Sequence, residues 1–219
     1  AFRDDPEALA LWREQTGVRI DGDIVRAPAD WIREICSNAP SQFTQLARNP
    51  ERSVTIGNRH QVFAPIYGAP FVRDLEKGRR YGDLESFQDL VRLTYMSPAL
   101  HHGGFVTCEP CDVPVSKRHL DMLFTHMTLS DKPHLGAITE MSRAQDSVDM
   151  AEIIFGQDTM ENNCVIMGNV NTNSPLLVDK VVTQAVRVYC GRGQGIVVVP
   201  FILSGAMGPV STAASVAQA

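Results

Sequence analysis

The sequence predicts an α/β protein that contains about the first five strands of a (β/α)8 TIM barrel, preceded by a small α+β region. Continuous apolar runs recur about every 32 residues, near His101, His134, Val165 and Val197. Because these runs do not alternate with polar residues, they are typical of parallel strands covered by helices. No glycine-rich phosphate-binding motif follows any of them, which weighs against dinucleotide-binding and P-loop folds and favours the barrel.

Residues 1–60 are predicted to form the α+β region. The signals here are local: prolines at helix boundaries, and an Asp21-Gly22 pair that favours a hairpin turn. In order, we expect a helix over 6–15, a hairpin over 18–26, a helix that starts at 28 and ends before 40, and strands over 43–47 and 53–56.

Residues 61–219 are predicted to form the incomplete barrel. Asp83 can cap a helix, Ser142 with Gln145 forms a capping-box pattern, and Ser174 before Pro175 is a typical helix start. Helices are expected to begin near 83, 116, 142 and 174, the last two ending at the glycines 156 and 191. The strands are expected over 61–67, 100–108, 134–139, 164–168 and 196–201, with a hairpin over 71–81. Asn169, Asn171 and Asn173 are expected in a loop after the fourth of these strands.

The strand count also predicts that the barrel continues in a longer protein. Five strands need about three further βα units, roughly a hundred residues, to close an eight-stranded barrel. The sequence starts without methionine and ends in small apolar residues, Ser211 to Ala219. We therefore expect this stretch to be inactive alone. Two open strand edges would favour pairing with another chain, so a homo-oligomer is expected.

Composition excludes several functional classes. The net charge is −5 and no long basic block occurs, so nucleic acid is not an expected partner. No apolar run approaches the roughly 20 residues that span a bilayer, so no membrane association is expected. The cysteines are irregularly spaced and no signal peptide is evident, which favours the reducing cytoplasm.

The C-terminal ends of the predicted strands form the candidate site, because active sites of such barrels lie there. Two carboxylates, two amides and two aromatic rings occupy these positions. Carboxylates supply negative charge, and aromatic faces attract a quaternary ammonium group by about 0.5–2 kcal/mol each. This mixture suits a small cation with polar appendages, and the alternative is an ordinary polar rim. The candidate substrate-binding residues are Tyr67, Glu109, Glu140, Asn169, Asn171 and Phe201.

Two further patterns could in principle bind a metal ion or carry redox chemistry. Cys108 and Cys111 form a C-x-x-C pair, but a zinc site needs two more ligands at suitable spacing. His119 and His126 share one helical face beside an apolar stripe, which is more typical of a solvated or partly buried pair. We therefore expect neither a metal site nor a redox disulfide.

Three segments carry a resemblance to a known family. They are Asp21 to Pro40 followed by Phe43, Asp74 to Arg80, and Pro200 to Ser211, the last of which reads PFILSGAMGPVS. Over most of its length the chain resembles the trimethylamine methyltransferase family, in particular members that lack pyrrolysine and act on quaternary amines such as glycine betaine. Relatives carry a similar Gly-Ala-x-x-Pro-Val-Thr segment and are about twice as long.

The resemblance implies a (β/α)8 barrel that moves a methyl group from a methylated amine to the Co(I) corrinoid (cobalamin) of a separate carrier protein. The implied partners are this carrier protein and the small methylated amine, and the chain itself is expected to bind no cofactor. No catalytic residue is carried over, since none matches a position here securely. In the trimethylamine enzymes pyrrolysine would fall after Ala219.

Two other functions fit the same predicted fold. A barrel lyase or aldolase would normally use a strand-end lysine to form a Schiff base. Lys132 precedes its predicted strand and Lys180 lies on a predicted helix, so this feature is missing. The second alternative is a non-catalytic domain that binds a methylated amine or only assembles with another chain.

Overall fold

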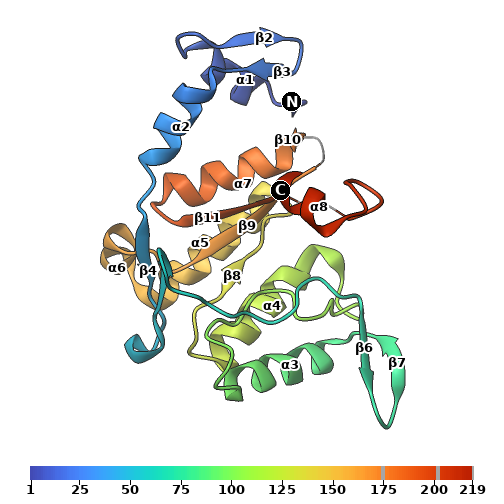
Figure 1. Cartoon of the computed structure of the whole chain (residues 1–219). Helices are drawn as coiled ribbons and strands as arrows, with labels where there is room; N and C mark the ends of the chain where they lie inside the picture. Colours follow the sequence, from blue (N-terminus) through green and yellow to red (C-terminus); the bar gives the residue numbers. More distant parts are fainter. Residues whose placement is uncertain (174–175, 201–202, 219) are drawn as a thin grey trace.

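Three parallel strands, β8 (Leu135–Gly136), β9 (Met167–Thr172) and β11 (Gly195–Pro200), form the central sheet (Figure 1). The computed structural model describes residues 1–173, 176–200 and 203–218. β9 is the middle strand and runs parallel to both neighbours. The strands therefore lie side by side in chain order, as successive βα units do.

Two helices, α5 (Met141–Phe155) and α7 (Lys180–Gly191), follow β8 and β9 and pack together over one face of the sheet (Figure 1). Each helix presents a stripe of small and apolar residues to the strands, and burial of such area is the main source of folding free energy. The alternation of strand and helix predicted over 134–200 is therefore present. The buried residues of this contact include Ala144, Val148, Ala151, Val165, Ile166, Ala185, Val188 and Tyr189.

The contact between α7 and the sheet depends on glycine at two strand positions. Tyr189 of α7 is fully buried, and its hydroxyl donates to the carbonyl oxygen of Ala137 at 3.0 Å. A Cβ added at Gly168 would lie 3.0 Å from the Tyr189 ring, and one at Gly136 would overlap the Tyr189 hydroxyl. Close packing of this large side chain thus requires residues without a side chain beneath it.

Two segments predicted as strands, 61–67 and 100–108, are not strands in the structure. Proline and glycine explain the error. Pro65 has no N–H to donate to a ladder, and Gly104 has a φ of 68°, which lies outside the strand region. The apolar run over 100–108 was a correct sign of burial, since residues 102–108 are buried, but most of 61–67 is exposed, and neither run pairs as a regular strand.

Backbone hydrogen bonds still hold both segments beside the sheet. The N–H of Gly68 donates to the carbonyl oxygen of Val106 at 2.7 Å, and the N–H of Leu135 in β8 donates to that of Gly104 at 2.9 Å. Five segments therefore lie in one row in chain order, and three of them are strands. A closed eight-stranded barrel stays a prediction.

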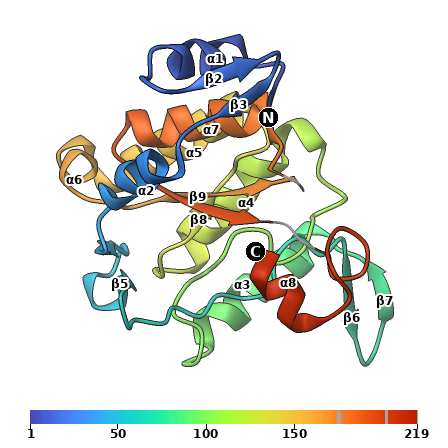
Figure 2. The same cartoon turned by 45° about the horizontal axis from the view of Figure 1, so that its top comes forward.

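The N-terminal elements lie along α7 (Figures 1 and 2). Asp5 caps the first helix by accepting from the N–H of Ala8 at 3.1 Å, and it also accepts from the Thr183 hydroxyl and pairs with Arg187, both on α7. β1 (Phe2–Arg3) pairs in parallel with β10 (Val178–Asp179).

The helices and hairpins predicted for the first 60 residues are confirmed. The two hairpins are antiparallel, and a short 3-10 helix, η1 (Pro50–Arg52), joins the strands of the second. The elements are α1 (Pro6–Arg13), β2 (Arg19–Asp21), β3 (Ile24–Arg26), α2 (Ala29–Ser37), β4 (Gln42–Gln45) and β5 (Val54–Gly57).

The remaining elements also follow local signals. Asp83 caps α3 by accepting from the N–H of Ser86 at 2.8 Å, and Gly156 ends α5 with a φ of 80°, both as predicted. No helix in the described part of the chain has the length and apolar character that a membrane crossing requires. These elements are β6 (Phe71–Asp74), β7 (Gly78–Tyr81), α3 (Leu84–Met96), α4 (Val115–Leu129), α6 (Gln157–Asn162) and α8 (Thr212–Gln218).

Two predicted helix starts differ from the structure. Glu140 occupies the N-cap of α5 and makes no capping bond with its side chain, so the predicted box with Ser142 is wrong. Helix α7 begins at Lys180, because residues 178–179 form β10 and pair with the N-terminal strand. Ser174 and Pro175, the predicted start of that helix, lie outside the described residues.

Candidate functional site

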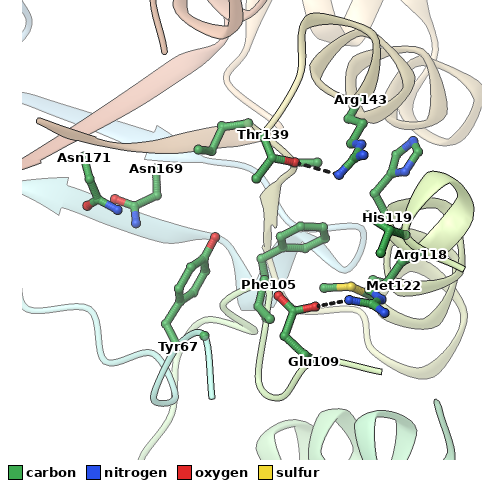
Figure 3. A pocket seen from close by; sticks show the side chains of 15 residues that line it. Tyr67, Phe105, Glu109, Arg118, His119, Met122, Thr139, Arg143, Asn169 and Asn171 are labelled. Atoms are coloured by element: carbon green, nitrogen blue, oxygen red, sulfur yellow. Dashed lines mark hydrogen bonds and ion pairs between the residues drawn. The ribbon is translucent and has the colours of Figure 1, made fainter. Parts of the chain in front are cut away.

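A cavity of about 310 Å³ opens where β8 and β9 end, between the sheet, α4 and the two irregular segments (Figure 3). Its wall combines aromatic rings, amides, one carboxylate and two guanidinium groups. The lining residues are Tyr67, Gly68, Phe105, Val106, Glu109, Val115, Arg118, His119, Met122, Ala137, Ile138, Thr139, Arg143, Asn169 and Asn171. The position agrees with the rule that sites in parallel α/β folds lie at the carboxyl ends of strands.

Four of the six candidate residues meet in this cavity. Tyr67, Glu109, Asn169 and Asn171 all line it, although they come from three different segments of the chain. Glu140 does not line it, because it caps α5 with a side chain that is 56% exposed. Phe201 lies outside the described residues. The role of the four lining residues in substrate binding stays a prediction.

Strand alternation places both asparagines on the cavity side of β9. Asn169 and Asn171 are two positions apart and therefore point to the same face, whereas Val170 between them is buried against the helices. Their side-chain amides have no hydrogen-bond partner among the described residues that line the cavity. Both amide groups can therefore bind a polar group of a ligand.

Tyr67 presents a neutral phenol to the cavity. Burial and the nearby negative charge of Glu109 raise the pKa of Tyr67 to about 12. The whole residue is still 40% exposed, so solvent weakens the influence of that charge. At neutral pH the hydroxyl keeps its proton, and the ring supplies an electron-rich face.

Glu109 is paired with an arginine that the sequence did not indicate. Arg118 of α4 lies 3.1 Å from the Glu109 carboxylate, and its Nε and Nη2 groups donate to the carbonyl oxygen of Val113 at 3.2 and 2.9 Å. The negative charge on this side of the cavity is therefore partly compensated. Arg118 in turn has three fixed contacts, which is typical of a structural guanidinium group.

Arg143 is the second arginine in the wall. Its guanidinium donates to the Thr139 hydroxyl at 3.1 Å and to the Glu140 carboxylate at 2.8 Å, and its side chain is only 16% exposed. A signal in the sequence could have singled it out. A cation in the first turn of a helix is disfavoured by the helix dipole, so Arg143 in the first turn of α5 suggests a role other than stability.

His119 lies beside Arg143 (Figure 3). Its Nε2 is 2.7 Å from a carboxylate oxygen of Asp146, and its buried Nδ1 has no hydrogen-bond partner among the described residues. His119 and His126 were expected to be a solvated or partly buried pair on one helical face and not ligands; in the structure His126 Nε2 contacts the carbonyl oxygen of Phe105 at 2.8 Å. His119 belongs to the cavity wall and His126 to the core below it.

The cysteines and the lysine considered from sequence lie elsewhere. Cys108 is buried, which raises the pKa of its thiol to about 11, and Cys111 is exposed; both are free thiols. Lys132 donates to the carbonyl oxygens of Thr94, Ser97 and Leu100 at the end of α3, so its amine is occupied. Among the described residues, no group of three or more His, Cys, Asp or Glu side chains could hold a metal ion, and no lysine lines the cavity.

Comparison with known proteins identifies the family of the chain. The family profile described as trimethylamine methyltransferase matches residues 1–219. The chain belongs to the trimethylamine methyltransferase family. It is also 34% identical over 207 residues to a glycine betaine methyltransferase of Desulfitobacterium hafniense (strain Y51). That match covers 94% of this chain and 43% of the relative, so the chain spans less than half of the relative's length. The resemblance found in the sequence is confirmed.

Proposed function

We propose that the protein takes a methyl group from a methylated amine and transfers it to the Co(I) corrinoid of a separate carrier protein. Membership of the trimethylamine methyltransferase family supports this proposal, as does the relative that is named for glycine betaine. In the structure, the lining of the cavity is the observation that most directly supports the proposed function. Tyr67 and Phe105 lie in the same wall as the Glu109 carboxylate, which is a suitable environment for an alkylated ammonium group.

The proposed reaction is an in-line displacement at a methyl carbon. The Co(I) centre of the acceptor supplies the electron pair of the new bond to carbon, and the C–N pair leaves with nitrogen. A quaternary ammonium group leaves as a neutral tertiary amine, so no proton has to be transferred. The work of this chain is then to hold the cation, direct one methyl group to the opening and exclude water.

We assign the residues of the cavity wall the following roles in substrate binding. The rings of Tyr67 and Phe105 bind the methylated head, and Glu109 supplies negative charge that Arg118 moderates. A fully charged, unpaired carboxylate would hold the cation strongly in the ground state and would not speed the transfer. The free amides of Asn169 and Asn171 contact the polar part of the substrate or its solvent.

We further propose that the five hydrogen-bonded segments are one wall of the predicted barrel. Their sequential order and parallel direction support this arrangement. The open end of the cavity at the strand termini is then the place where the carrier protein presents its corrinoid. The corrinoid is a substrate brought by a partner, and no group of this chain is assigned to hold it.

The proposal is tested with the full-length protein and a reduced corrinoid carrier. Glycine betaine, choline, trimethylamine and dimethylamine are added in turn, and the absorbance of Co(I) is followed. We expect Co(I) to be consumed with at least one of these amines and not without the protein. If none of them consumes Co(I) under conditions where the carrier stays reduced, the proposed function is wrong.

A further inference from the structure

The two sides of the cavity differ in charge. Tyr67, Phe105 and Glu109 form one side, with aromatic rings and a carboxylate, whereas Arg143 and His119 form the opposite side (Figure 3). A simple cation such as an alkylammonium ion needs only the first side. The second side adds nothing favourable for it, because the guanidinium group of Arg143, which is paired with Glu140, presents donors and positive charge to the cavity.

The two arginines of the wall are not equivalent. Arg118 is bound on three sides by Glu109 and the Val113 carbonyl, so its donors are in use. Arg143 donates only to Thr139 and to Glu140, and its other N–H groups have no partner among the described residues. A guanidinium group that is 16% exposed normally fills more of its five donors than this.

The present partner of Arg143 is a surface group. Glu140 is 56% exposed and lies outside the cavity wall, three residues before Arg143 on the same helix end. Ion pairs of this exposed kind contribute little to stability, so the pair can be exchanged at small cost. The arrangement keeps Arg143 in position while leaving its cavity-facing donors available for a second anion.

We propose that Arg143 binds a carboxylate of the substrate and thereby selects a zwitterionic quaternary amine over a simple methylated cation. The ammonium head lies against Tyr67 and Phe105, and the carboxylate lies against Arg143. Glu140 is a positioning residue that holds Arg143, which replaces its predicted role in binding the substrate. This inference rests on the proposed function, since it assumes that the cavity binds a methylated amine.

The remaining features of this side fit a carboxylate. Arg143 can bind it in the bidentate geometry that guanidinium and carboxylate groups favour. His119 lies on the same side, but its Nε2–H donates to Asp146, so the neutral ring leaves only an acceptor at Nδ1 and is not assigned to the carboxylate. A cavity of about 310 Å³ is at the lower end of the range for small-molecule sites, about 300–1,000 Å³, so it suits a compact zwitterion.

The test compares two ligands that differ only at the distal group. Glycine betaine and choline share the trimethylammonium head, but choline has a hydroxyl group where betaine has a carboxylate. Their dissociation constants are measured by calorimetry with the full-length protein and without the corrinoid carrier. We expect the wild-type protein to bind glycine betaine at least about tenfold more tightly than choline.

Substitution of Arg143 should remove this preference. In Arg143→Gln, we expect glycine betaine to bind about tenfold or more weakly, with choline changed by less than about threefold. Arg143→Lys should retain part of the preference, because the charge remains and the bidentate geometry is lost. Glu140→Ala should weaken glycine betaine more than choline, because Arg143 loses the group that positions it, and Glu140→Gln, which keeps an acceptor for Arg143, should restore part of the preference.

A matched control separates this effect from a general loss of stability. Arg92 forms the same kind of pair on α3, with Asp89 at 2.8 Å three residues earlier, and it does not line the cavity. Arg92→Gln should leave both dissociation constants unchanged. If the wild-type protein binds choline as tightly as betaine, or Arg143→Gln weakens both equally, the inference is wrong.

Failure of this inference differs from failure of the proposed function. A wild-type protein that consumes Co(I) equally well with glycine betaine, choline and trimethylamine would retain the proposed function and contradict the role of Arg143. A protein that binds glycine betaine selectively through Arg143 but consumes no Co(I) with any amine would support the role of Arg143 and contradict the proposed function. Melting temperatures of all variants show whether a weak binder is folded.

Discussion

Tyr67 and Glu109 show how single side chains set the character of the cavity. Burial, with a smaller contribution from the Glu109 carboxylate, raises the pKa of the Tyr67 phenol to about 12, so the hydroxyl is neutral at pH 7. Arg118 offsets part of the charge of Glu109 at 3.1 Å. Attraction for a methylated head should therefore depend mainly on the aromatic faces.

The ring of Tyr67, rather than its hydroxyl, should carry the binding. Tyr67→Phe keeps the aromatic face, so we expect the dissociation constant of glycine betaine to change by less than about threefold. Tyr67→Ala removes the face and should weaken binding by about 3- to 30-fold. Titration calorimetry of both variants checks this. A large loss in Tyr67→Phe together with a small further loss in Tyr67→Ala would assign the binding to the hydroxyl group.

The residues of the site differ in how far the sequence could reveal them. Asn169 and Asn171 were predicted for the site as part of a loop after an apolar run, whereas in the structure both belong to β9, and the two-residue period of the strand turns both to the cavity. Arg118 and Arg143 were missed, because each lies on a helix and reaches the cavity through the packing of that helix on the sheet; for Arg143 the positive charge in a first helical turn was an available signal. Glu140 was predicted for the site because it ends a strand segment, but as the N-cap of α5 it faces solvent.

At the scale of elements, α7 packs so closely on the sheet that an added side-chain atom at Gly136 or Gly168 would overlap or crowd its neighbours. Tyr189 lies directly over Gly136 and Gly168, and its hydroxyl donates to Ala137. A side chain at either glycine would force the helix away from the strands. Because β9 carries two asparagines of the cavity, such a shift would also disturb the site.

Gly136→Ala should destabilise the protein by about 1–3 kcal/mol, because the added methyl group overlaps Tyr189 and lies 2.8 Å from the Ser147 Cβ. Gly191→Ala is the matched control. No atom lies within 4 Å of a Cβ added there, at the end of α7, so stability should stay equal or rise slightly. Denaturant unfolding measures both. Equal stability of the two variants would show that the contact is looser than the structure indicates.

A buried histidine cluster joins other elements beneath the cavity. His102 accepts from the Gly104 N–H with Nδ1 at 2.9 Å and contacts the Gln45 side chain with Nε2 at 3.1 Å. His126 and His134 stack with their ring centres 5.3 Å apart. Burial lowers the pKa of both His102 and His126 to about 3, and it lowers that of His134 as well. All three rings are therefore neutral at pH 7.

This cluster predicts an acid-sensitive fold. An unfolded histidine takes up a proton near its ordinary pKa of about 6.5, whereas His102 and His126 resist protonation until about pH 3. Stability is thus fully present above about pH 6.5 and is lost as the pH falls toward 3. At pH 5 the free energy of unfolding should be lower than at pH 7 by up to about 2 kcal/mol per buried histidine.

The pH effect is checked by denaturant unfolding at pH 5 and pH 7. His126→Leu should reduce the difference between the two values, since one buried ring no longer titrates in the unfolded state. The exposed His60 offers the control, and His60→Gln should leave the difference as it is. A fold whose stability is the same at both pH values would mean that the three rings are already charged or are open to water.

Elements with local signals were predicted well, and elements that need a partner were not. The Asp83 cap and the Gly156 end of α5 rest on interactions within one turn, which the sequence contains. Segments 61–67 and 100–108 are apolar and buried in part, but proline and glycine interrupt their pairing. Pro65 and Gly104 were local warnings against these two strands, but the extent of the pairing also depends on the backbone of the neighbouring segment.

At the scale of the whole molecule, the described chain is a row of five parallel segments with helices over one face and a cavity at the strand ends. The row places Tyr67, Glu109 and Asn169 in one wall although they are far apart in sequence. The match to the glycine betaine methyltransferase covers 43% of that relative. We therefore propose the methyl transfer for the full-length protein, with this cavity as part of its site.

The proposed reaction moves a methyl group from the amine to the corrinoid of the carrier protein. The most direct measurement uses glycine betaine with deuterated N-methyl groups, the full-length protein and a reduced carrier. Mass spectrometry should find one trideuteromethyl group on the corrinoid for each dimethylglycine released. If the corrinoid stays unlabelled and betaine stays intact, and the same holds for deuterated trimethylamine, the proposed methyl transfer is wrong.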